Sequence, residues 1–286
     1  MNDNFLIVKN PFFESEIKKN GCNCEPLYKS YSKFSLRLGN LTRNVRFFER
    51  YNLNPVLEHV EEEAVVIFDG GTKLNTLRWF AQKYKEKRLI FYYWNPVSLS
   101  ISPELIPQVF EKWSYSPSDC KKYGLKYNST FFFPELADGK EMEIEQDVFF
   151  VGKNKSRKVM LEYYESFFQK KGFSTNFVII GDCGTPLLYS EIIERDIRSK
   201  AIFDYYTDPQ AGLSLRAMEA LFLERKLITN NLTIMDYDFY NPDNIFVIGQ
   251  RNNAELESFL ESPSELISGE VKDRYSFKQW VNRFNC

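Results

Sequence analysis

Short apolar runs alternate with amphipathic stretches along the first half of this 286-residue chain. Apolar runs of strand length lie at residues 5–9, 64–68 and 89–93, with weaker ones at 110–115 and 127–133. Between the second and third runs, residues 75–87 place Leu77, Phe80 and Tyr84 near one helical face. A strand, a helix and another strand in this order predict a parallel, right-handed unit.

The same alternation restarts after an acidic, polar stretch at residues 134–146, which we interpret as a linker between domains. The expected later strands are 147–151, 177–180, 201–205, 227–229 and 245–248. The expected helices are 156–171, 189–197, one that opens near Gly212, 254–260 and 276–284. The pattern predicts an α/β fold with two Rossmann-like domains, residues 1–140 and 147–270, facing across a ligand cleft.

The last residues, 271–286, form a separate feature. Phe277, Trp280, Val281 and Phe284 make one apolar stripe at helical spacing. We expect this helix to cross back and pack on the first domain.

Composition and charge exclude several classes of protein. A formal net charge of -2 gives no reason to expect nucleic-acid binding. No apolar run approaches the roughly 18 residues of a membrane span, and the amino terminus lacks a secretory leader. The five scattered cysteines favour neither a disulfide framework nor a metal site. We therefore expect a cytoplasmic protein or one at the inner face of the cell membrane.

The segment from Ala211 to Asn230 carries the strongest candidate chemistry. Gly212, Leu213 and Ser214 open a helix, whose first turn presents unpaired N–H groups and a positive dipole end. This is a site for a phosphate or pyrophosphate. Glu219 lies deeper in the helix, where a carboxylate can accept hydrogen bonds from a ribose. The alternative is an ordinary capped helix with one polar residue.

Three segments in this order resemble the donor domain of GT-B glycosyltransferases. They are Asp147–Arg157 (DVFFVGKNKSR), Phe177–Cys183 (FVIIGDC) and Gln210–Asn231 (QAGLSLRAMEALFLERKLITNN). In addition, residues 116–134 look like small bacterial enzymes of capsule, O-antigen or lipopolysaccharide assembly. The resemblance covers about residues 110–250, and the amino-terminal half has no match. It implies a transferase that moves a sugar from a nucleotide-diphosphate sugar to a lipid-linked saccharide acceptor in bacterial surface polysaccharide assembly.

The resemblance also implies roles for residues of the second domain. Basic residues after Gly152 would face the donor pyrophosphate, Lys153 and Arg157 ahead of Lys155, and would neutralise the leaving diphosphate. The alternative is a solvated, basic helix start. The implied donor-binding residues are Lys153, Arg157, Gln210, Gly212, Leu213, Ser214 and Glu219. Arg216 has two interpretations, a phosphate contact or, in preference, an ion pair with Glu219 or Glu224.

Polar and aromatic residues end two strands of the first domain. Asp69, Gly70 and Gly71 follow the strand 64–68, and Trp94 and Asn95 follow the strand 89–93. Asp69 is the candidate general base, and the other four are candidate acceptor-binding residues. The alternatives are a carboxylate that caps the next helix and an aromatic side chain packed in the core. His59 is a weaker candidate base on a surface helix.

No metal or cofactor is assigned. Asp236-Tyr237-Asp238 matches a metal-binding DxD pattern, but we interpret it as structural because GT-B enzymes generally need no metal at the reaction centre. A membrane-surface contact is expected from the basic, aromatic stretches 43–50 and 78–88, with solvated faces as the alternative. The rival function is a catalytically inactive nucleotide- or sugar-binding partner of a polysaccharide-assembly complex.

Overall fold

The computed structural model describes residues 4–8, 11–29, 52–139, 142–154, 156–181, 187–208 and 212–285. The chain divides into two compact units, Met1–Asn128 and Ser129–Cys286. The acidic stretch expected as a linker therefore lies inside the second unit. This unit begins earlier because residues 131–133 pack within it, where Phe132 stacks on Phe222 with ring centroids 4.8 Å apart.

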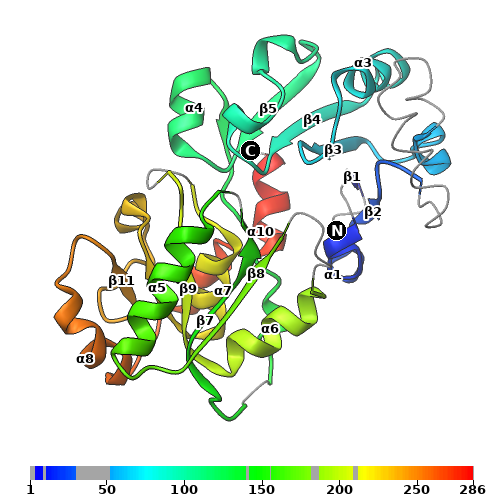
Figure 1. Cartoon of the computed structure of the whole chain (residues 1–286). Coiled ribbons are helices and arrows are strands. Elements are labelled where there is room, and N and C mark those ends of the chain that lie inside the picture. The colour runs from blue at the N-terminus through cyan, green and yellow to red at the C-terminus, as the bar shows by residue number, and fades with distance from the viewer. Residues whose placement is uncertain are drawn as a thin grey trace. The chain divides into compact units, whose positions relative to one another are not determined.

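The first unit contains a six-stranded sheet in which every neighbouring pair of strands is parallel (Figure 1). Its order is β2-β1-β3-β4-β5-β6. The strands are β1 (Phe5–Val8), β2 (Asn23–Glu25), β3 (Ala64–Phe68), β4 (Arg88–Tyr93), β5 (Phe110–Ser114) and β6 (Lys126–Tyr127). All five residues of β3, AVVIF, are buried, as is typical of a parallel strand covered on both faces.

The described helices of the first unit are short. They are α1 (Glu14–Lys19), α3 (Leu74–Lys83) and α4 (Pro117–Tyr123), with 3₁₀ turns η1 (Pro11–Phe13), η3 (Pro55–Glu58), η4 (Val97–Leu99) and η5 (Pro103–Leu105). Helix α3 places Leu77 and Phe80 in the core beside β3 and β4 residues such as Val65 and Phe91. Helix α4 has the capping signals of its sequence, since Ser116 accepts a hydrogen bond from the Asp119 N–H and Gly124 ends the helix in the left-handed region.

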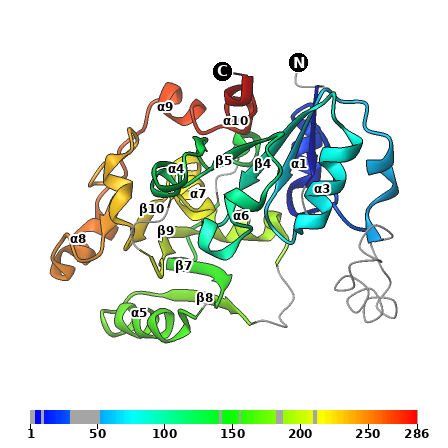
Figure 2. The ribbon, with the colours of Figure 1, turned by 90° about the horizontal axis from the view of Figure 1, so that it is seen from above.

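The second unit contains a five-stranded, fully parallel sheet in the order β11-β10-β9-β7-β8 (Figure 2). The strands are β7 (Gln146–Lys153), β8 (Thr175–Ile180), β9 (Ser199–Asp204), β10 (Lys226–Thr229) and β11 (Ile245–Val247). The helices are α5 (Lys158–Lys170), α6 (Tyr189–Ile197), α7 (Leu215–Leu223), α8 (Leu256–Glu261), α9 (Gly269–Asp273) and α10 (Phe277–Asn282). The 3₁₀ turns are η6 (Pro134–Leu136), η7 (Leu232–Asp236), η8 (Asn253–Glu255) and η9 (Arg283–Asn285).

Both sheets are wound in the same way. In each, the first strand of the unit lies between the second and third, so the chain leaves in opposite directions from that strand. The reversal falls between β1 and β3 in the first unit and between β7 and β9 in the second. In open parallel sheets, ligands bind at the carboxyl ends of the two strands that flank such a reversal. The topology alone therefore assigns one candidate site to each unit.

The predicted α/β class with two Rossmann-like units is confirmed. Strands expected at 64–68, 89–93, 177–180 and 227–229 lie within one or two residues of β3, β4, β8 and β10, and α6 matches its expected range 189–197. The strand expected at 127–133 is wrong beyond Tyr127, because Phe131–Phe133 pack instead against α7 and α10. The sequence reading missed β2, α1, α4 and α9, which are all seven residues or fewer.

The aromatic stripe of α10 is buried as expected. Phe277, Trp280, Val281 and Phe284 are each fully buried. The Phe277 ring lies 5.1 Å from that of Phe131, and both residues belong to the second unit. The return of this helix to the first domain stays a prediction.

Candidate functional site

The strands that flank the reversal in the second unit separate toward their carboxyl ends. The ladder between β7 and β9 extends to Phe149 opposite Ile202. Strand β7 nevertheless continues to Lys153, paired with β8, and β9 continues to Asp204, paired with β10. The last residues of β7 and β9 thus face each other without a ladder between them. Backbone polar groups in this gap need other partners.

Two arginine side chains supply those partners. Arg216, from the first turn of α7, donates from Nη1 to the Val151 carbonyl of β7 at 2.9 Å. Arg157, just before α5, donates to the carbonyl of Tyr205, the residue after β9. Each guanidinium therefore binds the end of one of the two separated strands.

Both guanidinium groups lie over the same aromatic ring. The Cζ atoms of Arg157 and Arg216 are 5.2 Å and 5.3 Å from the centroid of the Phe150 ring. Gly152 makes room for them, because a Cβ atom at this position would lie 3.0 Å from Arg157 Nη2 and 3.2 Å from Arg216 Nη1. The glycine that ends the strand motif is thus needed for the approach of two cations.

The cations outnumber their counter-charge. Asp204, at the end of β9, accepts from Arg216 Nε at 2.8 Å, whereas Arg157 makes no ion pair with any described residue. Burial and the charge of Arg216 lower the pKa of Arg157 to about 10, so it stays cationic at neutral pH. Burial lowers the pKa of Arg216, but Asp204 more than reverses this. Arg157 therefore has no ion-pair partner among the described residues, and this favours an anion beside it.

Arg216 forms an ion pair, as expected, but the predicted partner is wrong. The partner is Asp204 rather than Glu219 or Glu224, and Glu224 pairs with Lys272 at 2.6 Å instead. Asp204 ends a strand that is adjacent in space and twelve residues away in sequence. A helical i, i+3 or i+4 search does not reach it.

The start of α7 is locked from several sides. Ser214 caps the helix by accepting from the Ala217 N–H, and its hydroxyl donates to Asp204 at 2.5 Å. Its own N–H donates to the Tyr206 hydroxyl at 2.7 Å. On the opposite side of the same peptide group, the Thr130 hydroxyl donates to the Leu213 carbonyl at 2.5 Å. The helix-cap alternative is therefore true of Ser214, and the positive end of α7 is held beside the arginines.

The remaining predicted donor residues differ in exposure. Lys153 is exposed at the end of β7, whereas Gly212 and Leu213 are buried. Gln210 and Lys155 lie outside the described residues. Lys153, Arg157 and Ser214 are thus brought to one edge of the sheet.

Glu219 occupies a different environment from the one expected of an open ribose site. Its side chain is 2% exposed, and Asp196 on α6 is 1% exposed. Burial raises the pKa of Glu219 to about 7, although Arg216 and a hydrogen bond with Tyr189 oppose the rise. Burial and the neighbouring Glu219 also raise the pKa of Asp196. A ribose contact would require movement around α7, so this role stays a prediction.

The candidate residues of the first unit also come together at the carboxyl ends of their strands. The Asp69 carboxylate accepts from the Trp94 N–H at 3.0 Å, the Asn95 N–H at 3.3 Å and the Asn95 side chain at 3.2 Å. Asp69 is 6% exposed, and burial raises its pKa despite these hydrogen bonds. The alternative, in which Asp69 caps the next helix, is wrong, because its side chain instead joins the turn after β4 to the end of β3 and α3 has no side-chain cap.

Space remains beside this turn. A Cβ at either Gly70 or Gly71 would have no atom within 4 Å, and Gly71 has a φ of +77°, which favours glycine. The partly buried ring of Trp94 lies 5.6 Å from that of Phe68 and 6.2 Å from that of Phe13. The core-packing alternative holds for one side of this ring. The base and acceptor roles stay predictions.

The weaker candidates have ordinary surroundings. His59 is exposed at the end of η3. Asp238 accepts from Arg274 at 2.5 Å and from the Tyr275 hydroxyl at 2.6 Å, in agreement with a structural role. Across the part of the chain that the structure describes, no cluster of three or more His, Cys, Asp or Glu residues could hold a metal ion.

The expected membrane contact is not supported at residues 78–88. Lys83 pairs with Glu58 at 2.6 Å and Arg88 with Glu111 at 2.5 Å, so part of the basic charge is neutralised within the unit. The stretch 43–50 lies outside the described residues. No described helix is long and apolar enough to cross a bilayer.

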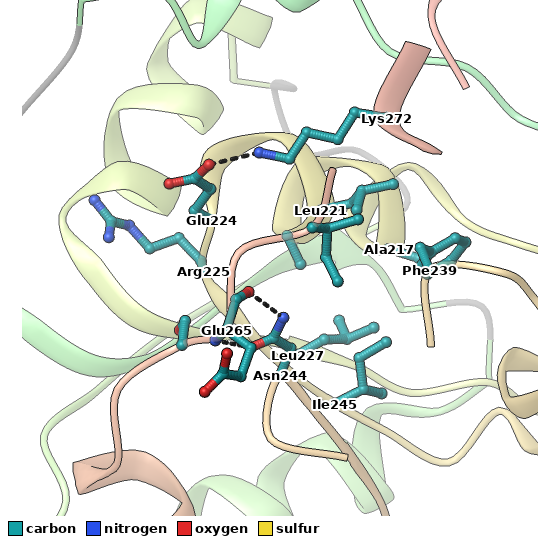
Figure 3. A pocket seen from close by; sticks show the side chains of 13 residues that line it. Ala217, Leu221, Glu224, Arg225, Leu227, Phe239, Asn244, Ile245, Glu265 and Lys272 are labelled. Atoms are coloured by element: carbon teal, nitrogen blue, oxygen red, sulfur yellow. Dashed lines mark hydrogen bonds and ion pairs between the residues drawn. The ribbon is translucent and has the colours of Figure 1, made fainter. Parts of the chain in front are cut away.

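Concave surface in the second unit lies at the other end of α7. One small pocket is lined by Glu224, Arg225 and Lys272 and by apolar residues of α7, β10 and β11 (Figure 3). A neighbouring hollow of about 680 Å³ shares these three residues. Both lie where β10 begins, and neither is lined by a predicted donor residue.

The chain has only low similarity to known proteins. No protein-family model and no curated protein matches the chain. Among solved structures, it is similar to an alpha-glucosyltransferase in complex with UDP and a 13-mer DNA containing an HMU base, at 12% identity and a TM-score of 0.47, over 98% of this chain and 92% of that one. It is also similar to the glycotransferase of kitacinnamycin, at 9% identity and a TM-score of 0.42, over 97% and 87%. A third is spinosyn forosaminyltransferase, at 10% and 0.39, over 97% and 84%.

Three features of the site were not predicted from the sequence. The Asp204–Arg216 pair and the Thr130 bond to Leu213 join residues far apart in sequence. The buried Asp196 was hidden inside an amphipathic helix. Only the strand-final position of Asp204 offered a signal, because polar residues at strand ends gather at the ligand edge.

Proposed function

We propose that this chain is a glycosyltransferase of the GT-B type that binds a nucleotide-diphosphate sugar at the carboxyl edge of its second sheet. The proposal rests mainly on Arg157 and Arg216, whose guanidinium groups lie over Phe150 at the reversal between β7 and β9. Only Arg216 has an ion-pair partner there, the carboxylate of Asp204. A diphosphate supplies the missing negative charge, and the positive end of α7 adds to the attraction.

The same groups suit the chemistry of transfer. Transfer breaks the bond between the sugar's anomeric carbon and a diphosphate oxygen, so negative charge grows on the leaving diphosphate. Guanidinium groups fixed in advance stabilise that charge without reorganising. Lys153 provides a further, exposed cation. Metal independence is part of the proposal, because these cations occupy the role that a metal ion has in other transferases.

The acceptor side is assigned to the first unit. Trp94 offers a ring for a sugar face, Asn95 offers an amide, and Gly70 and Gly71 leave the backbone open to approach. Asp69 is proposed as general base, which requires it to exchange one of its present hydrogen bonds for an acceptor hydroxyl. The resemblance of residues 116–134 supports a saccharide acceptor, lipid-linked, in bacterial surface polysaccharide assembly.

Calorimetry with nucleoside diphosphates and their sugars tests the proposal. Arg157→Gln should weaken binding roughly ten- to a hundredfold, since hydrogen bonds to charged groups contribute about 1.5–3 kcal/mol. Arg195→Gln is the matched control: it removes the same charge from the last turn of α6, near the start of β9. Equal affinities for both variants and the unchanged protein, or no nucleotide binding at all, would contradict the donor site.

One observation favours a second candidate, an inactive nucleotide- or sugar-binding partner. Both oxygens of Asp69 already accept hydrogen bonds from the turn at residues 94–95, which leaves the proposed base engaged. The two candidates differ in turnover. Release of nucleoside diphosphate from a nucleotide sugar, lost in Arg157→Gln, identifies the enzyme, whereas tight binding without release identifies the partner.

A further inference from the structure

Helix α5 exposes more large apolar side chains than any other helix that the structure describes. Val159 is 78% exposed, Tyr163 58% and Met160 36%. Other exposed apolar residues of the described chain are scattered singly over different turns and helices. Single exposed residues need no explanation, but a group on one helix marks a surface for contact.

These side chains share one side of the helix. Val159 and Tyr163 are four residues apart, and Met160 lies three residues before Tyr163. Leu161 and Phe168 occupy the opposite side, where they are buried in the core of the second unit, and Phe167 is partly buried against the same core. Helix α5 lies beside β7 and β8 at one edge of the sheet (Figure 2). The apolar side thus faces away from the core that the helix covers.

Positive charge accompanies this face. Lys170 lies seven residues after Tyr163 on the same side, and the Lys171 ammonium lies 5.6 Å from the Phe167 ring centroid. Of the helix's two carboxylates, Glu165 is partly buried, and Glu162, which lies beside Val159, pairs with Lys158 at 3.4 Å. The exposed face therefore combines Val, Met and Tyr with Lys170 and Lys171, and its one acidic group has a lysine partner.

We propose that this face of α5, defined by Val159, Met160, Tyr163, Lys170 and Lys171, rests on an anionic lipid surface. Aliphatic side chains enter the boundary below the headgroups, a tyrosine ring lies at headgroup depth, and lysines attract anionic lipids. This inference does not rest on the donor site. It also differs from the expectation for residues 78–88, where Glu58 and Glu111 neutralise Lys83 and Arg88.

Cosedimentation of the full chain tests the proposal, with vesicles of phosphatidylcholine and phosphatidylglycerol in equal parts at low salt. Val159→Ser with Tyr163→Ser should reduce partitioning at least about tenfold, because two apolar side chains no longer enter the bilayer. Lys170→Gln with Lys171→Gln should reduce it several-fold and weaken its salt dependence. The control is Leu266→Ser, which removes a side chain that is 80% exposed elsewhere in the second unit.

Selective loss in the α5 variants, with thermal midpoints unchanged, supports the lipid surface. No binding by the unchanged protein, or an equal loss in Leu266→Ser, overturns it. Equal binding to phosphatidylcholine alone overturns the anionic preference. Sedimentation velocity adds one more arm: self-association that disappears in the Val159 and Tyr163 variant would assign the face to a second copy of this chain and overturn the proposal.

Discussion

The two units have the same winding but opposite electrostatics at the equivalent edge. In the second unit, Arg157 and Arg216 lie where β7 and β9 separate, and Asp204 balances only one of them. In the first unit, the end of β3 carries the carboxylate Asp69, surrounded by peptide and amide donors without a cation among its hydrogen-bond partners. One edge thus has an arginine without an ion-pair partner among the described residues, and the other has a carboxylate beside amide donors and an aromatic ring.

This difference separates what topology contributes from what side chains contribute. The reversal of strand order opens a crevice in any such sheet, whatever its sequence. Charge then selects the ligand. In the proposed function, the unpaired cation of the second edge binds a diphosphate, whereas Trp94 and Asn95 on the first edge bind an uncharged saccharide.

The largest expected effect concerns Asp69 in the first unit. Asp69→Ala should lower the free energy of unfolding by about 2–4 kcal/mol, because the buried N–H groups of Trp94 and Asn95 lose their acceptor. Nucleotide affinity of the second unit should stay unchanged. Urea denaturation and calorimetry measure the two. If stability is kept while sugar transfer disappears, Asp69 is a catalytic base rather than a fastening residue.

The next prediction concerns the effect of the buried Glu219 carboxyl, beside Arg216, on the stability of the second unit. Burial raises the pKa of Glu219 from 4.5 to about 7. The folded chain therefore keeps a proton that the unfolded chain releases in this window, so the carboxyl destabilises the fold as pH rises through it. Glu219→Gln should stabilise the protein by about 1–3 kcal/mol at pH 8 and have little effect at pH 4.

Nucleotide affinity of the same variant tests the ribose role of Glu219. A tenfold loss, with thermal stability maintained, would support direct contact with the ligand. Unchanged affinity would show that Glu219 acts only inside the helix pair α6 and α7. Melting curves over the pH range and calorimetry near pH 7 give both results.

A smaller effect is expected from a substitution beside the two arginines. Gly152→Ala should displace the two guanidinium groups, which a Cβ would approach to 3.0 Å and 3.2 Å, and should weaken nucleotide binding about tenfold. Gly181→Ala is the control at the end of β8, since a Cβ there has no atom within 4 Å. Equal affinity of the two variants would mean that the arginines do not bind the nucleotide.

The smallest effect concerns the start of α7. Thr130→Val removes the hydroxyl that donates to the buried Leu213 carbonyl, at a cost of about 1 kcal/mol or roughly fivefold in nucleotide affinity. Thr130→Ser keeps the hydroxyl and should restore binding. Failure of the serine variant to restore it would assign the effect to packing of the threonine methyl group.

The order of elements was predictable because parallel strands buried on both faces are continuous apolar runs. AVVIF at 64–68 and the helix at 189–197 needed no tertiary information. Small elements such as β2 and α9 were not predictable, since three to five residues carry too little periodicity. The aromatic side chains of residues 131–133 favour a strand, but their packing on α7 and α10 overrides this intrinsic preference.

The α/β class, the glycine-ended strands and the residue types at the strand ends could be predicted from the amino-acid sequence, because they follow from local periodicity and turn chemistry. Which of these residues meet depends on the tertiary structure. It paired Arg216 with Asp204, stacked two guanidiniums on Phe150 and buried Glu219 beside Asp196. Such contacts depend on strand order and on the point where β7 and β9 separate, and neither is encoded in the spacing of neighbouring residues.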